Sequence, residues 1–168
     1  LGPGDVILLT EMEHHANLVP WQQLCAERGC SLRFLHVRDD GILDLAPLEE
    51  PASALPGVIA PAGRLRLVAL THASNVLGTV NPVAEIARLA HEAGAKVVVD
   101  GAQAVAHGPV DVAALGCDFY AFSGHKMYAP MGIGALWGRR ELLEAMSPWQ
   151  GGAELDHPAQ AVLRTFDQ

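Results

Sequence analysis

Six short apolar runs alternate along the chain with longer segments of helical pattern, and this alternation limits the folds open to it. Several of the runs are apolar on both faces, as buried parallel strands are. Strands that alternate with helices build a mainly parallel sheet with helices on both faces. The sequence therefore predicts a three-layer α/β fold with strands at Val6 to Leu9, Leu32 to Val37, Leu67 to Thr71, Val97 to Asp100, Phe119 to Ser123 and Ile133 to Trp137.

The segments between these runs carry signals for the beginnings and ends of helices. Ala16 to Arg28 predicts a helix that ends at Gly29. Pro82 to Ala93 has one apolar face, with Asn81 as the expected N-cap and Gly94 at the left-handed position after the helix. We also expect a loop over Glu49 to Gly63 with a short helix before it, and a last helix over Arg139 to Met146.

Composition excludes several classes of protein. The chain of 168 residues is long enough for one domain with a core, and half of its residues are hydrophobic. Its net charge of -8, without a cluster of Lys or Arg, argues against nucleic acid as a partner. No apolar run approaches the roughly 20 residues of a membrane span, and no signal peptide is visible. Cys25, Cys30 and Cys117 lack CxxC spacing, so we expect no metal site, and reduced thiols in the cytoplasm.

Polar side chains follow four of the predicted strands, at the edge where parallel sheets bind their ligands. Taken alone, each has an ordinary explanation: Asp100 as a turn residue, Lys126 as a surface lysine, a histidine as a structural hydrogen bonder. Together they favour one shared site, because every strand end would otherwise need a separate reason to be polar. The residues are Glu13, His14 and His15, then His72 and Asn75, then Asp100 and Gln103, then Ser123, His125 and Lys126.

Lys126 indicates the chemistry of this site. It and Lys96 are the only lysines in a chain that otherwise uses arginine, and only a lysine amine can lose a proton and attack a carbonyl. Its Gly, His and aromatic neighbours are expected to desolvate the amine and ease its deprotonation. Pyridoxal phosphate requires such a lysine for a Schiff base, and an acid beside its pyridine nitrogen. Partners for the ring and phosphate complete the predicted set: Lys126, Asp100, Gln103, His14, Ser123 and His125.

Five stretches in order resemble one family. They are "MEHHANLVPWQ", "THASNVLGTVNP", "VVVDGAQAVAHGPVDV", "CDFYAFSGHKMYAPMGIGALWG" and "PWQGG", and they span nearly all of residues 4–152. The chain resembles the cysteine desulfurase and selenocysteine lyase family, within the class V aminotransferase-like pyridoxal-phosphate enzymes of fold type I. The resemblance implies the central part of the pyridoxal-phosphate-binding large domain of that fold for residues 1–152, and a divergent or truncated tail over residues 153–168.

The resemblance also implies a role for each matching residue. Lys126 would hold the cofactor and move a proton, and His14 would stack on the ring and act as an acid or base. Asp100 would pair with the pyridinium nitrogen and Gln103 with the ring hydroxyl. Asn75 would contact that hydroxyl or the substrate carboxylate, while Ser123 and His125 would bind the phosphate.

The implied reaction converts L-cysteine to L-alanine and passes the sulfur to an enzyme cysteine as a persulfide, for iron–sulfur cluster assembly. A sulfur-acceptor protein and a homodimer of the full-length protein belong to the same expectation. The family's nucleophilic cysteine and substrate-binding arginine have no match in this chain, so we expect an inactive fragment lacking N- and C-terminal parts. Two alternatives remain: a selenocysteine lyase or other class V enzyme, and an inactive truncated scaffold.

Overall fold

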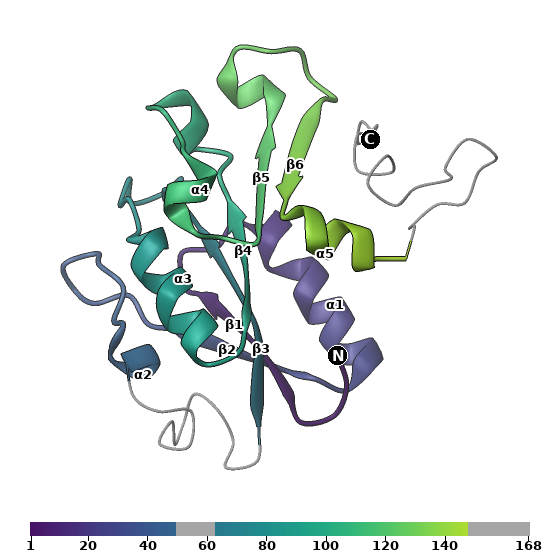
Figure 1. Ribbon diagram of the computed structural model, residues 1–168. Coiled ribbons are helices and arrows are strands. Elements are labelled where there is room, and N and C mark those ends of the chain that lie inside the picture. The colour runs from purple at the N-terminus through teal and green to yellow at the C-terminus, as the bar shows by residue number, and fades with distance from the viewer. Residues whose placement is uncertain (50–62, 148–168) are drawn as a thin grey trace.

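The computed structural model describes residues 1–49 and 63–147 (Figure 1). The expected tail over residues 153–168 lies outside the described residues, and so do residues 50–62 of the loop expected over residues 49–63. Within the described ranges, the prediction of a mainly parallel α/β fold is confirmed: six strands form one sheet in the order β2-β1-β3-β4-β5-β6.

Each expected strand is present, with bounds that differ by a few residues at most. The first five strands pair in parallel, and β6 pairs antiparallel to β5 at one edge. The carboxyl ends of five neighbouring strands therefore meet along the same rim, as the strand-end argument required. The strands are β1 (Asp5–Thr10), β2 (Ser31–Leu35), β3 (Arg64–Thr71), β4 (Lys96–Asp100), β5 (Phe119–Ser123) and β6 (Gly134–Gly138).

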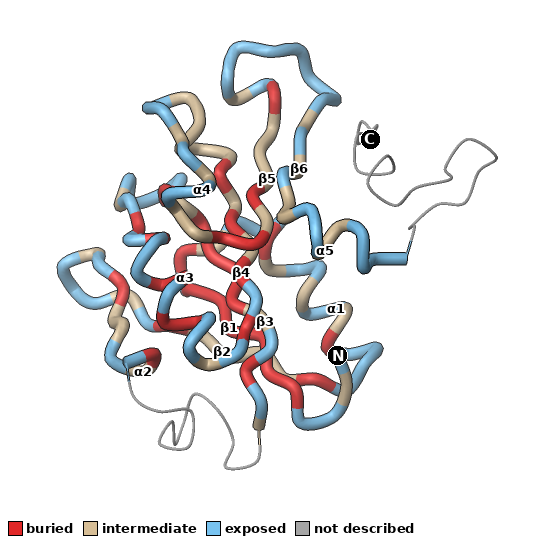
Figure 2. Tube along the Cα trace, viewed as in Figure 1, coloured by how far each residue is buried: buried red, intermediate tan, exposed pale blue. Residues whose placement is uncertain are grey.

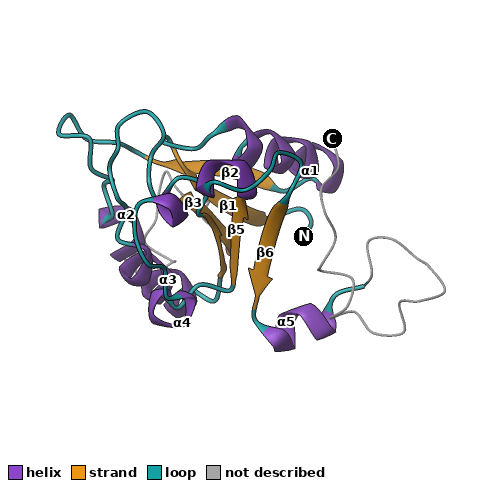
Figure 3. Ribbon diagram, turned by 90° about the horizontal axis from the view of Figure 1, so that it is seen from above, coloured by secondary structure: helices purple, strands orange, loops and turns teal. Residues whose placement is uncertain are grey.

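Alternate side chains of β1 pack on opposite faces of the sheet. Val6 and Leu8 belong to the larger core cluster, while Ile7 and Leu9 belong to the smaller one, and all four are buried. Because successive side chains of a strand point to opposite faces, a strand that is apolar throughout needs a cover on both. Figure 3 shows that cover, with α1 on one side of the sheet and α3 and α4 on the other. The buried trace in Figure 2 follows the central strands between these helices.

The helices follow the expected signals, with two corrections. The helices described are α1 (Val19–Arg28), α2 (Ala46–Glu49), α3 (Val83–Glu92), α4 (Val112–Leu115) and α5 (Arg140–Ala145). Gly29 ends α1 with a φ of 72°, as the predicted helix end requires, and Gly94 follows α3 with a φ of 78°, so its predicted left-handed position is confirmed.

The first correction concerns the single helix expected over residues 16–28. The structure instead has a 3-10 turn, η1 (His15–Asn17), followed by α1 from Val19. The side chain of His14 caps the turn by accepting a hydrogen bond from the Ala16 amide. A separate turn at this point carries His14 to the rim of the sheet.

The second correction concerns Asn81, which does not cap α3. Its Nδ2 donates a 2.8 Å hydrogen bond to the carbonyl of Thr71, at the end of β3. The N-cap position of α3 belongs to Pro82, which makes no side-chain capping bond. The Asn81 amide is buried, and a buried carbonyl at a strand end needs a donor, so the tertiary contact displaced the local one.

Candidate active site

The carboxyl rim of the sheet holds a cavity of about 580 Å³. This volume lies within the range of roughly 300–1,000 Å³ found for small-molecule sites. Its walls come from η1, the ends of β4 and β5, the 3-10 turn η4 (Gly124–Met127), and the start of β6. Five predicted site residues line it together: His14, Asp100, Ser123, His125 and Lys126.

Asp100 ends β4 and is held at the cavity wall by backbone contacts on both sides. Its Oδ1 accepts a 2.9 Å hydrogen bond from the amide of Ala102, and its carbonyl accepts one of 2.8 Å from the amide of His72. Gly101 then donates its amide to the carbonyl of Ala121 at 2.7 Å. These contacts fix the direction of a half-buried carboxylate that faces the cavity.

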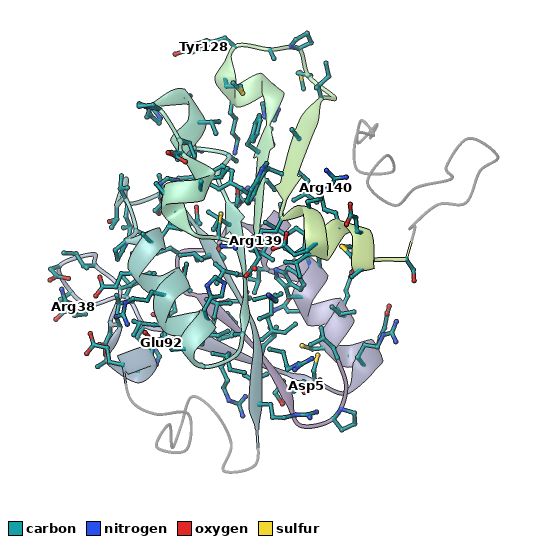
Figure 4. The ribbon with its side chains drawn as sticks, in the orientation of Figure 1. Asp5, Arg38, Glu92, Tyr128, Arg139 and Arg140 are labelled. Atoms are coloured by element: carbon teal, nitrogen blue, oxygen red, sulfur yellow. The ribbon has the colours of Figure 1, made fainter. Side chains whose placement is uncertain are left out.

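Lys126 lies in η4, directly after β5. Gly124 donates its amide to the carbonyl of Ile133 at 2.7 Å, and the Gly124 carbonyl accepts the amide of Ala129 at 3.0 Å. Tyr128 closes the turn with a φ of 68°, which is uncommon for a residue other than glycine. Figure 4 shows Tyr128 at the tip of the loop between β5 and β6. Lys126, two residues earlier, lines the cavity. The turn is therefore pinned on both sides of the lysine.

His14 lies in extended backbone just before η1, with its side chain exposed at the mouth of the cavity. Its Nδ1 accepts a 3.1 Å hydrogen bond from the Ala16 amide. A ring nitrogen that accepts carries no proton, so the neutral ring of His14 carries its proton on Nε2. The local turn thereby sets both the ring's direction and its tautomer.

Asn75 and Gln103, the other two predicted residues, line a separate neighbouring cavity of about 740 Å³. It lies between the loop after β3 and the segment that follows Asp100. His72 also lines it, and its Nδ1 lies 2.9 Å from the buried hydroxyl of Tyr120. Burial lowers the pKa of His72 and raises the pKa of Tyr120. The structure does not bring Asn75 and Gln103 into the cavity of Lys126, and their predicted roles stay predictions.

Asn17 was not expected at the site, and Glu13 was counted among its polar residues without a role. Asn17 lines the cavity with Lys126, and Glu13 accepts a hydrogen bond from the side chain of Asn17. The adjacency of Glu13 to His14 was the available signal. An acidic residue beside a histidine is too common to be assigned without knowing what it contacts.

The model for the family described as aminotransferase class-V matches residues 1–167. The chain belongs to the aminotransferase class-V family. The likeness to the cysteine desulfurases within it is confirmed by sequence: a cysteine desulfurase of Klebsiella pneumoniae (strain 342) is 58% identical over 155 residues. That match covers 92% of this chain and 36% of the relative.

Solved structures of this aminotransferase class-V fold agree. The cysteine desulfurase CsdA of Escherichia coli, with an S-sulfonic acid, matches with a TM-score of 0.75 and 46% identity, over 91% of this chain and 36% of that one. A lysine-to-alanine variant of C-DES, with glycine covalently linked to its PLP cofactor, matches with a TM-score of 0.71 and 32% identity, over 90% and 39%. The chain thus spans little more than a third of the relatives it matches.

Two negative findings apply to residues 1–49 and 63–147. No helix in these ranges is long and apolar enough to cross a membrane. The same part of the chain contains no group of three or more His, Cys, Asp or Glu side chains that could hold a metal ion.

Proposed function

We propose that this chain is the cofactor-binding part of a pyridoxal-phosphate-dependent cysteine desulfurase. The observation that carries the proposal is that Asp100, at the end of β4, and Lys126, in the turn after β5, line the same cavity. The similarity to cysteine desulfurases over 92% of the chain supports the same conclusion.

The residues present fit pyridoxal phosphate. The cavity offers one amine from Lys126 and one carboxylate from Asp100, together with the side chains of Ser123 and His125 for an anionic group. This donor set matches the parts of the cofactor: an aldehyde, a ring nitrogen and a phosphate. Bound there, the cofactor would supply an electron sink that labilises bonds at the Cα and Cβ of an amino acid.

Each side chain has a defined task in this proposal. The Lys126 amine binds the cofactor aldehyde and carries a proton to or from the substrate. The Asp100 carboxylate keeps the ring nitrogen protonated, because a negative charge nearby favours the cationic form. His14 covers the ring and offers its Nε2 proton. Gln103 and Asn75 would approach the ring hydroxyl from the side of the neighbouring cavity.

The proposed substrate is L-cysteine, which yields L-alanine while its sulfur passes to an enzyme cysteine. Cys25, Cys30 and Cys117 are all buried, and none lines the cavity. They are therefore poor acceptors. We assign the sulfur-accepting cysteine, and the group that binds the substrate carboxylate, to the part of the relatives' length that this chain does not span. By itself the chain would bind cofactor but release no sulfur.

A homodimer and a sulfur-acceptor protein complete the proposal for the full-length protein. Exposed apolar side chains beside the two cavities support a covering surface there, among them Val76 (81% exposed), Tyr128 (95%) and Met131 (83%). Free thiols without a disulfide also suit a reducing compartment such as the cytoplasm. The mass of the full-length protein in solution tests the dimer.

The central test uses the two lysines as a matched pair. The purified protein is mixed with pyridoxal phosphate, reduced with borohydride and digested, and the pyridoxyl-bearing peptide is identified by mass. We expect the label on Lys126. A Lys126→Ala variant should carry no label and should lack the cofactor's absorbance band near the edge of the visible range. A Lys96→Arg variant should behave as wild type. A Lys126→Ala variant that kept the absorbance band would refute the assignment. Alanine release from L-cysteine by the full-length protein tests the substrate.

A further inference from the structure

Glu13 is a half-buried acidic side chain that receives three hydrogen bonds from three different parts of the fold. Its Oε1 accepts from the hydroxyl of Thr10 at 2.5 Å and from the amide of Thr71 at 2.9 Å. Its Oε2 accepts from Nδ2 of Asn17 at 2.6 Å. Thr10 ends β1, Thr71 ends β3 and Asn17 ends η1. One carboxylate therefore joins two strand ends to the turn that carries His14.

The network lies directly beside the cofactor cavity. Thr71 is the register partner of Asp100 in the pairing of β3 with β4, and Asn17 lines the cavity. Burial raises the pKa of Glu13, and the nearby carboxylate of Asp100 acts in the same direction. Glu13 thus lies in the electrostatic range of the acid assigned to the ring nitrogen, and one residue from His14.

The polarity of this network is fixed from one end. The indole Nε1 of Trp21 donates a 3.0 Å hydrogen bond to Oδ1 of Asn17, and an indole N–H can only donate. Oδ1 of Asn17 must therefore face Trp21, which turns Nδ2 toward Glu13. Asn17 and the Thr71 amide both present donors, so the group at position 13 must accept on both of its terminal atoms. A carboxylate does so, whereas a carboxamide accepts on only one.

We infer that Glu13 is a positioning residue, which holds the turn bearing His14 and Asn17 against the cofactor cavity through a hydrogen-bond network of fixed polarity. The role of the cavity rests on the proposed function above, while the network itself does not. Glu13 touches neither reacting atoms nor cofactor in this assignment. It acts through His14 and Asn17, because its hydrogen bonds fix their positions relative to Thr71 at the end of β3, beside Asp100.

The inference predicts a failure and a rescue. In Glu13→Gln, the new amide can take two orientations. In one, its nitrogen faces Nδ2 of Asn17, and in the other it faces the Thr71 amide, so two donors oppose each other in both. In the double variant Glu13→Gln with Asn17→Asp, the Gln amide nitrogen donates to the new Asp carboxylate. That carboxylate still accepts from Trp21, and the Gln oxygen still accepts from Thr10 and Thr71. Every contact then regains a donor and an acceptor.

The experiment follows two kinds of signal in the full-length protein. The cofactor signal consists of the visible circular dichroism and the dissociation constant of bound pyridoxal phosphate. The network signal is the exchange rate of the Trp21 indole proton by NMR. We expect Glu13→Gln to weaken cofactor binding about tenfold, to change the dichroism and to speed the indole exchange. The double variant should return both signals toward wild type. Glu11→Gln is the matched control, since Glu11 is an exposed glutamate of the same loop that contacts His36 and Val37 instead.

The outcomes separate the two ideas. Unchanged dichroism, affinity and indole exchange in Glu13→Gln would overturn the inference while leaving the cofactor assignment standing. A wild-type protein without bound cofactor would overturn the proposed function, and the indole exchange of the three variants would still decide the network. A double variant that is worse than Glu13→Gln in both signals would show that the polarity argument is wrong.

Discussion

The ring of Tyr120 lies directly against the α-carbon of Gly101. A Cβ atom placed on Gly101 would lie 2.0 Å from Cε1 of Tyr120 and 2.3 Å from its hydroxyl oxygen. Tyr120 is fully buried, and its hydroxyl is held by His72, so the ring has no room to withdraw. The glycine after Asp100 is therefore required for the carboxylate to reach the cavity wall.

Gly101→Ala should be strongly damaging for this reason. Overpacking of a buried site costs about 1–3 kcal/mol, and the backbone shift would move Asp100 away from the cavity. We expect a lower midpoint of thermal unfolding and weaker pyridoxal phosphate binding. Gly108→Ala is the matched control, because nothing lies within 4 Å of a Cβ there. Equal stability and cofactor affinity for the two variants would contradict the packing argument.

Gly124→Ala should separate cofactor binding from stability. A Cβ on Gly124 would lie 3.0 Å from the carbonyl oxygen of Ile133 and 3.3 Å from Cβ of Ala129, so the turn would have to shift by a few tenths of an ångström. We expect a stability loss of only about 1 kcal/mol but a clear loss of cofactor affinity, because Lys126 lies in that turn. Titration with pyridoxal phosphate, alongside denaturant unfolding, measures both. A variant with wild-type affinity would mean that the turn tolerates the shift.

Asp118 directly precedes β5, at the end of that strand far from the cavity. Its carboxylate should dominate the loss of stability of the protein in acid. Its carboxylate is buried and contacts Nε2 of His91 at 2.7 Å, the amide of Val97 at 2.8 Å, and the cations of Lys96 and Arg139 at 3.4 and 3.5 Å. Burial alone would raise the pKa of Asp118, but the hydrogen bonds from His91 and Val97 hold it below its usual value. The native state therefore favours the ionised form.

The sign of the pH effect follows from that lowered pKa. Stabilisation by Asp118 is fully present above a pH of about 4 and disappears as the pH falls through the lowered folded-state pKa. Asp118→Asn should lower the free energy of unfolding at pH 7 by about 2 kcal/mol, because it removes the charge from a buried carboxylate that accepts hydrogen bonds from His91 and Val97. Asp40→Asn, at an exposed pair with Arg38, should leave the unfolding curve nearly unchanged. Urea unfolding at pH 7 and at pH 2 measures the effect, and the stability difference between wild type and Asp118→Asn should shrink at pH 2. An equal difference at both pH values would argue against this role.

The thiols should be unreactive in the folded protein. Burial raises the pKa of Cys25 to about 12, with its neighbour Cys30 adding to the shift, and burial also raises the pKa of Cys117. The thiolate is the reactive form, so iodoacetamide at pH 8 should label none of the three thiols in the native protein and all three after unfolding. Mass spectrometry counts the labels. Rapid labelling of native Cys25 would show that it is more accessible than its buried position indicates.

The alternation of apolar runs was sufficient to predict the strands, because a strand buried on both faces must be apolar throughout. It also placed His14, Asp100, Ser123, His125 and Lys126 at one edge, since the carboxyl ends of parallel strands meet there. Local sequence signals were less decisive where a buried group elsewhere in the fold competed for the same side chain. Asn81 has the pattern of a helix cap, yet its amide serves the carbonyl of Thr71 instead.

The sequence by itself determined the layers of this fold and the strand ends that carry its polar groups, because both depend on periodicities along the chain. The tertiary structure alone decided that Asn75 and Gln103 face a separate cavity, and that Glu13 joins two strands to the turn of His14. Those facts depend on the register between strands and on the direction of each donor and acceptor. Contacts between residues as distant as Glu13 and Thr71 are settled only when the whole sheet assembles.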